Sequence, residues 1–159
     1  MGEVVANATT FINGLEQYER RFVRMFRSRV RMLMSEGMRR MLARTPVHTG
    51  QAAMNYVASA GAPVGGSINK GYTPVEPTNA LPLGAERLRR RAEAVSLATL
   101  SSVSYDDPFK DFYITNSTPH IAGLEYGVLP HDPYTPRSPS GMFRITNQEL
   151  ILLLSSGKL

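Results

Sequence analysis

From Phe112 to Gly127 the chain reads F-Y-I-T-N-S-T-P-H-I-A-G-L-E-Y-G, and the rest of the sequence is organised around these residues. The opening aromatic and β-branched residues are typical of a strand. Pro119 and the polar residues before it end that strand, because proline donates no ladder hydrogen bond and Asn, Ser and Thr favour turns. Ile121 and Leu124 follow at near-helical spacing, and Gly127 suits the left-handed end of a helix. We therefore predict a strand, a tight corner and a short helix, without a reaction centre.

Composition restricts the class of protein. A chain of 159 residues with 42% hydrophobic and 19% charged residues is expected to form one globular domain spanning residues 1–159. The absence of cysteine excludes disulfides, thiolate metal sites and cysteine catalysis. No basic segment followed by an apolar run opens the chain, so we expect no signal peptide, and no window is apolar enough for a membrane span.

The net charge of +5 is carried almost entirely by arginine, since lysine occurs only at positions 70, 110 and 158. The planar guanidinium group holds carboxylates and phosphates in fixed geometry, whereas lysine acts as a flexible point charge. The excess of arginine over lysine therefore favours a protein–protein interface or a surface that faces DNA.

A long helix is predicted from about Gly14 to Arg44. Pro46 ends it, because the residue before a proline is pushed out of helical geometry, and Gly37 is a candidate bend. Residues 1–10 are small and polar and are expected to form a mobile arm or an edge-strand lead-in. The apolar face recurs mostly at steps of three and four: Leu15, Tyr18, Phe22, Phe26, Val30, Leu33, Met34, Met38 and Met41.

This helix carries more apolar surface than a domain of this size can cover alone, and it is studded with arginines. Five of the eight methionines also fall in it, at positions 25, 32, 34, 38 and 41. Methionine fills cores but also adapts to interfaces. We therefore expect the helix to contact another subunit, while its arginine face is either solvated or lines a DNA channel.

The remaining elements follow from shorter patterns. We predict a second helix at about 84–101, a strand at 109–115 and a closing helix within 142–156. Thr49 and Gly50 suggest an N-cap for a short turn, and residues 54–60 form either a strand or the end of that turn. Two segments rich in glycine or proline, 61–84 and 128–140, are expected as extended loops that contact neighbours. The predicted fold class is α+β, with helices packed on a small, mostly antiparallel sheet.

Four short motifs follow one another along the chain. They are Pro46-x-x-Thr49-Gly50, Tyr113-Ile114-Thr115-Asn116, Pro119-His120-x-x-x-Leu124-Glu125-Tyr126-Gly127 and Pro139-x-Gly141-Met142-x-Arg144. Their order resembles the tail-completion proteins of long-tailed bacteriophages, which are minor tail or neck components similar to the lambda-type protein Z. The resemblance covers about residues 14–154. His120 stands where such proteins usually carry an aromatic residue, and the loop after Gly127 is longer here.

The resemblance implies a structural, non-enzymatic virion protein that is assembled in the host cytoplasm. It implies a ring, six-fold by analogy with phage tails, that completes the tail and joins it to the head connector. The expected partners are further copies of the chain, the tail terminator or tail tube, and the connector or head-closure proteins, with passive contact to packaged DNA. We expect no cofactor, no metal and no membrane contact.

Other functions remain open from the sequence. The protein could fill a neighbouring neck role, as tail terminator, connector or head-closure protein, or it could be a non-specific DNA-binding module. A small hydrolase would use His120 or His131, but no Gly-x-Ser-x-Gly motif is present. The three histidines match no zinc spacing, and the glycines at 61–66 are not followed by the Gly-Lys-Ser/Thr of a phosphate-binding loop.

Candidate interface residues lie in several of these segments. Glu125 is either exposed at the end of a short helix or buried and paired with Arg144, because an arginine–carboxylate fork would fix that helix against the C-terminal segment. The residues that we predict for subunit or neck contacts are Phe22, Met25, Phe26, Arg29, Thr49, Gly50, Arg89, Tyr113, Asn116, His120, Glu125, Tyr126 and Arg144.

Overall fold

The structure, a computed structural model, describes residues 2–47, 50–66, 85–127 and 141–157. In chain order its elements are α1 (Gly2–Arg44), the 3₁₀ turn η1 (Ala53–Asn55), β1 (Tyr56–Ala60), α2 (Ala85–Ser101), β2 (Phe112–Asn116), α3 (Ile121–Tyr126) and α4 (Phe143–Ser155). The α+β class predicted from the sequence is confirmed. Of the loop predicted at 61–84, residues 67–84 lie outside the described residues, as do the loop predicted at 128–140 and Thr49.

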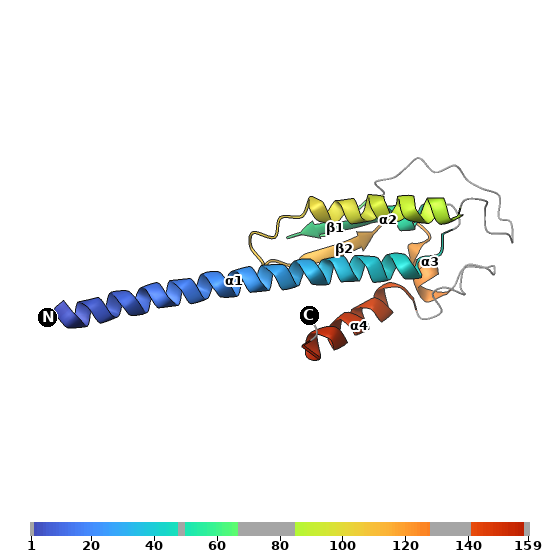
Figure 1. The fold of residues 1–159 in the computed structure, drawn as a ribbon. Helices are drawn as coiled ribbons and strands as arrows, with labels where there is room; N and C mark the ends of the chain where they lie inside the picture. Colours follow the sequence, from blue (N-terminus) through green and yellow to red (C-terminus); the bar gives the residue numbers. More distant parts are fainter. Residues whose placement is uncertain (1, 48–49, 67–84, 128–140, 158–159) are drawn as a thin grey trace.

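Helix α1 dominates the shape. Its 43 residues span about 65 Å at 1.5 Å per residue. The C-terminal half carries the sheet and α2 along one side and α4 along another, while the N-terminal half extends beyond all of them (Figure 1). The predicted end at Arg44 is confirmed, but the predicted start is wrong. Residues 2–10 are neither an arm of irregular structure nor a strand lead-in, because no proline or cap interrupts helix propagation there.

The sheet is a single antiparallel pair. Tyr56 pairs with Asn116 and Ala60 with Phe112, so the strand predicted at 109–115 lies at 112–116. Of the two alternatives for residues 54–60, the strand is confirmed for 56–60. A two-stranded sheet is marginal by itself, and here α2 packs on β1 while α1 packs on β2.

The main core lies between α1, α2 and the sheet. Met34, Met38 and Met41 are buried in it, so these three methionines are core residues rather than an interface. Met25 and Met32 remain 47% and 44% exposed. The core is completed mainly by Leu42, Val47, Ala53, Met54, Tyr56, Ala58, Ala92, Val103 and Tyr105.

Gly37 allows close approach within α1, which continues through it as an α-helix. A Cβ at this position would lie 3.2 Å from Leu150 Cδ1 and 3.4 Å from Ile114 Cδ1. Glycine therefore lets α4 and β2 approach the helix backbone.

Of the N-cap predicted at Thr49 and Gly50, Thr49 lies outside the described residues, and Gly50 is not the N-cap residue of η1. The N-cap position of η1 is Ala52, and it makes no side-chain cap hydrogen bond. Gly50 instead has a φ of +81° and accepts the N–H of Met54 through its carbonyl. Its left-handed backbone turns the chain from α1 toward β1.

Candidate assembly interface

The corner between α3 and α4 is built around Glu125. Its side chain is only 8% exposed, and its carboxylate accepts the backbone N–H groups of Met142 at 2.6 Å, Phe143 at 2.8 Å and Arg144 at 3.0 Å. These donors belong to the first turn of α4, where backbone N–H groups have no partner within the helix. Glu125 therefore caps α4 from a different element, and its negative charge faces the positive end of the helix dipole.

Arg144 completes the corner. Its Nε lies 3.3 Å from the Glu125 carboxylate, its Nη2 donates to the Glu125 carbonyl at 3.1 Å, and its guanidinium group lies 5.0 Å from the centre of the Tyr126 ring. The buried, paired alternative for Glu125 is thus confirmed. Because the Arg144 side chain is 56% exposed, its pair with Glu125 is partly screened by water, and the backbone donors contribute more.

Burial by itself would raise the pKa of Glu125, because it disfavours the charged form. The hydrogen bonds from the backbone N–H groups of residues 142–144 and from the Arg144 side chain act in the opposite direction and prevail, so the pKa is lowered from its ordinary value. Glu125 is therefore ionised at neutral pH, as a cap on α4 requires.

Gly141 sits against the same carboxylate with a φ of +84°. A Cβ there would lie 2.5 Å from Glu125 Oε1 and 2.8 Å from its carbonyl oxygen. The sequence analysis did not select Gly141 as a site residue, although the motif Gly141-Met142 was part of the resemblance. Its left-handed backbone brings the chain onto Glu125.

Thr45, the residue after α1, connects the end of that helix to the corner through buried polar contacts. Thr45 Oγ1 lies 2.8 Å from the Tyr56 hydroxyl, 2.7 Å from the Met41 carbonyl and 3.2 Å from Met142 Sδ. Thr45, Tyr56 and Met142 are all fully buried. Burial raises the pKa of Tyr56, so this hydroxyl stays protonated and able to donate.

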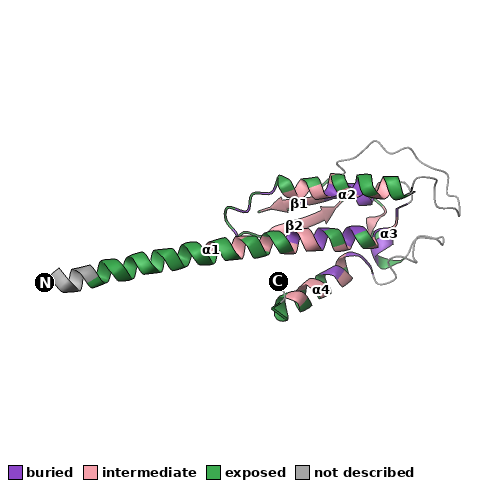
Figure 2. Cartoon of the chain, viewed as in Figure 1, coloured by how far each residue is buried: buried purple, intermediate pink, exposed green. Residues whose placement is uncertain are grey.

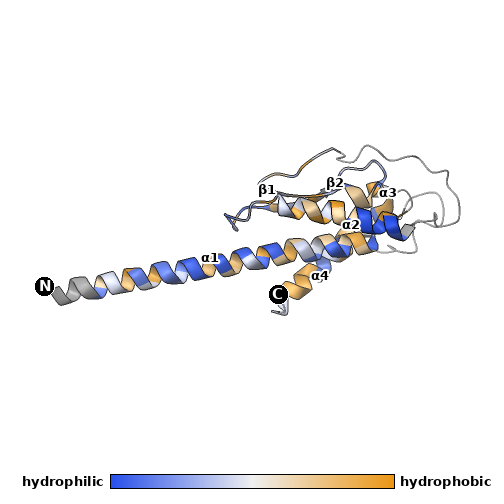
Figure 3. Cartoon of the chain, turned by 45° about the horizontal axis from the view of Figure 1, so that its top comes forward, coloured by the Kyte–Doolittle hydropathy of each residue, from blue (hydrophilic) through white to orange (hydrophobic). Residues whose placement is uncertain are grey.

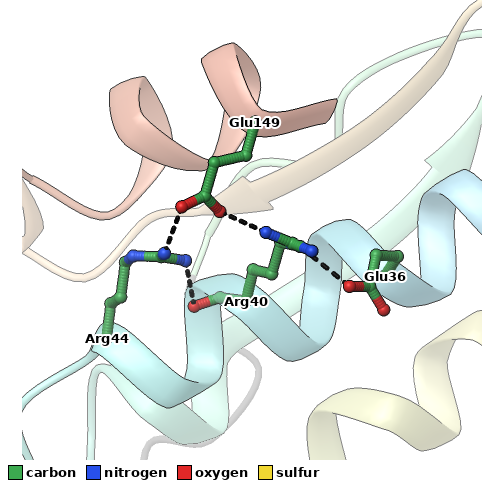
Figure 4. Close-up of polar contacts among 4 residues, drawn as sticks. All are labelled: Glu36, Arg40, Arg44 and Glu149. Carbon is green, nitrogen blue, oxygen red and sulfur yellow. Dashed lines mark hydrogen bonds and ion pairs between the residues drawn. The ribbon is translucent and has the colours of Figure 1, made fainter. Parts of the chain in front are cut away.

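A network of ion pairs also holds α4 along α1 (Figure 4). The Glu149 carboxylate accepts Arg40 Nη1 at 2.5 Å and Arg44 Nη2 at 2.6 Å, and Arg40 Nε also donates to Glu36 at 2.8 Å. The hydrogen bond from Arg40 to Glu149 raises the pKa of Arg40 more than its burial lowers it. The sequence analysis missed this network, because the distance from Arg40 to Glu149 along the chain gives no periodic signal.

Replacing Glu149 by glutamine is expected to lower the free energy of unfolding by about 1–2 kcal/mol, since one carboxylate serves two arginines that are both about three-quarters buried. Chemical denaturation at low and high salt measures this loss, which should shrink at high salt. Glu86→Gln is the matched control, because Glu86 pairs with Arg90 on an open helix surface and should show no measurable change. A loss as small as that of the control would contradict a role of Glu149 in holding α4.

No ion pair joins residues 7–22 of α1 to another described element. Residues 7–22 are all exposed, and no other described element covers them (Figure 2). Hydrophobic and strongly hydrophilic residues alternate along this part of the helix (Figure 3). The hydrophobic residues include large side chains that are exposed. Their exposed fractions are 71% for Phe11, 54% for Ile12, 57% for Leu15, 68% for Tyr18, 40% for Phe22 and 47% for Met25.

The predicted contact residues Phe22, Met25, Phe26 and Arg29 all lie where this half of α1 leaves the body. The rings of Phe22 and Phe26 stack at 6.1 Å, and Phe26 stacks on Phe109 at 5.3 Å. Arg29 is exposed, like Phe22 and Met25. The structure thus groups four of the predicted residues at one place.

The other predicted contact residues are dispersed, and several make contacts within the chain. Arg89 Nη1 donates to the Leu42 carbonyl at 3.4 Å, and Asn116 Nδ2 donates to the Ala52 carbonyl at 2.7 Å. Tyr113 is half-buried in β2. His120 precedes α3 and is half-buried, which lowers its pKa. Only Glu125, Tyr126 and Arg144 form a second group.

The described residues contain no helix that is long and apolar enough to cross a membrane. Within the same ranges, no three histidine, aspartate or glutamate side chains gather as they would to hold a metal ion. His48 and His131, two of the histidines considered from the sequence, lie outside these ranges.

Comparisons with protein-family models, curated proteins and solved structures find no match to this chain.

Proposed function

We propose that the protein is a structural, non-enzymatic component of a phage virion, which completes the tail and joins it to the head connector as part of a ring. The observation that carries the proposal is the uncovered apolar side of α1. Phe11, Leu15 and Tyr18 are each more than half exposed, on a helix that extends beyond its own body. Contiguous exposed apolar surface of this kind marks an interaction site.

In a ring, neighbouring copies would cover the apolar side of α1 that is exposed in a single chain. In a cyclic ring each subunit presents one face to one neighbour and a different face to the other. The chain offers separate apolar surfaces for these contacts, with α1 on one side and Ile151, Leu152 and Leu154 of α4 on another. The order of motifs that resembles tail-completion proteins supplies the virion context.

The position of the protein in electron-microscopy maps of intact particles tests this function. We expect its density in a ring between the tail tube and the head connector, with α1 against neighbouring copies. A second measurement is the mass of the purified protein in solution, which should be that of a monomer or of a ring. Density elsewhere in the particle, or a two-fold dimer as the only assembly with and without partners, would contradict the proposal.

A second candidate, non-specific DNA binding, is supported by arginines on α1 that form no ion pair with any described residue. Five of these are exposed: Arg21, Arg24, Arg29, Arg31 and Arg39. If all five contact phosphates, the logarithm of the affinity for duplex DNA should fall with the logarithm of salt concentration with a slope of about −4 to −5. The double variant Arg21→Gln/Arg24→Gln should reduce that slope by about 2. An affinity independent of salt would exclude this candidate.

A further inference from the structure

The exposed apolar residues of α1 follow a heptad repeat. Phe11, Leu15, Tyr18, Phe22 and Met25 are separated by alternating steps of four and three residues. This is the spacing of the a and d positions of a coiled coil, with Leu15 and Phe22 at a and the other three at d. We call these five residues the seam.

The seam ends where the body of the protein begins. The next a position is Arg29, and the following residue, Val30, packs against the protein's own core. Toward the N-terminus the register continues at Ala8, which is exposed and occupies an a position. The repeat is therefore confined to the part of α1 that no other described element covers.

The seam is narrow, because it is restricted to a and d positions. An apolar side that packs on a globular body is usually wider. An alternation of four and three keeps the same seam facing a second helix as the two wind around each other. The narrow seam therefore favours a helical partner over a flat surface.

The exposed area is also suitable for a stable contact. The seam and Ile12 expose between 40% and 71% of each side chain. With roughly 150–250 Å² for each large side chain, they offer about 600 Å² per subunit, close to the roughly 800 Å² per partner of a standard interface.

We propose that the occupants are the same segments of the other copies in the ring, which form one parallel, in-register coiled-coil bundle around the ring axis. This deepens the proposed function and rests on it, because subunits related by rotation about one ring axis point their helices the same way. A copy supplies a matching seam at every level.

The flanking positions allow this parallel alignment. In parallel coiled coils each g position faces the next e position of the partner. Gly14 would face Glu19 of the neighbour, and Arg21 would face Phe26, so these pairs set no like charges opposite each other. Arg29 is the exception at an a position, where a charged residue fixes register at a cost in stability.

The lack of cysteine in the chain makes a direct test possible. We would place single cysteines at Ala8→Cys or Met25→Cys and treat each full-length variant with a short bismaleimide. In the parallel arrangement each variant cross-links to itself, and a mixture of the two yields no mixed product, because 17 residues of helix separate the positions by about 25 Å. Asn13→Cys, on the side of the helix away from the seam, is the control and should not cross-link.

Each other outcome overturns the inference. Mixed Ala8–Met25 products would show antiparallel helices, and equal cross-linking at Asn13 would show random collision. The double variant Leu15→Asp/Phe22→Asp should lose cross-linking from Ala8→Cys but keep its thermal unfolding transition, because the seam lies outside the core. The charge-matched Asn13→Asp/Gln17→Asp variant should keep both the cross-linking from Ala8→Cys and the thermal unfolding transition.

Failure of this inference is distinguishable from failure of the proposed function. Absence of cross-links with correct density in the neck would show that another protein covers the seam. Cross-links as expected, together with density outside the neck, would instead keep the coiled coil and exclude the neck role.

Discussion

Replacing Gly141 by alanine is expected to lower the free energy of unfolding by about 3 kcal/mol, because two costs combine at this position. The backbone φ of +84° disfavours any residue with a Cβ, and the added carbon would lie 2.5 Å from the Glu125 carboxylate. The neighbouring atoms belong to a buried side chain and to backbone, so neither can move away without breaking the cap on α4. Chemical denaturation measures the loss.

Gly61→Ala is the matched control for the Gly141 variant. Gly61 has nearly the same φ, +82°, but nothing lies within 4 Å of the Cβ that would be added. It should therefore show only the backbone cost of about 1 kcal/mol. Equal losses for the two variants would mean that the contact with Glu125 contributes nothing.

Replacing Glu125 by glutamine is expected to cost about 2–3 kcal/mol. The carboxylate accepts three backbone N–H groups and one guanidinium N–H, whereas a glutamine amide keeps one acceptor oxygen and turns an N–H₂ group toward those donors. Thermal and chemical unfolding measure the loss. Glu16→Gln is the control, because Glu16 pairs with Arg20 in an exposed pair, and it should show no measurable change.

The contribution of Glu125 should also depend on pH. Its pKa is lower in the folded protein than the ordinary value of 4.5. The folded state therefore gains stability from the ionised carboxylate above pH 4.5, and this gain is lost as the pH falls through the folded pKa. The stability difference between the wild type and Glu125→Gln should shrink in acid. A difference that stays constant from pH 7 to about pH 3 would contradict this account.

Glu125 also joins two described parts of the chain that positions 128–140 separate. Its carboxylate accepts the N–H groups of Met142 and Phe143, and Gly141 lies against it at the end of α3. Whether the segment contacts a neighbour, as the sequence analysis predicts, stays a prediction.

The sequence by itself determined the elements whose signals are local. The spacing of apolar residues fixed α2 and most of α1, Pro46 fixed the end of α1, and Gly127 fixed the end of α3 with a φ of +66°. The pairing of Glu125 with Arg144 was one of two alternatives that the sequence left open, and the structure confirms it. The predicted start of α1 is wrong because the small and polar residues at 1–10 carry no helical signal of their own, although nothing among them stops a helix.

The tertiary structure alone decided which apolar residues are covered. Met34 and Met25 both belong to the five methionines that the sequence places on α1, yet one is buried in the core and the other is 47% exposed, because the body ends between them. Only the tertiary structure shows that Glu149 lies between Arg40 and Arg44 and that the carboxylate of Glu125 lies against Gly141. Burial and contact depend on what lies opposite a side chain in space, and a periodic pattern along one helix does not contain that information.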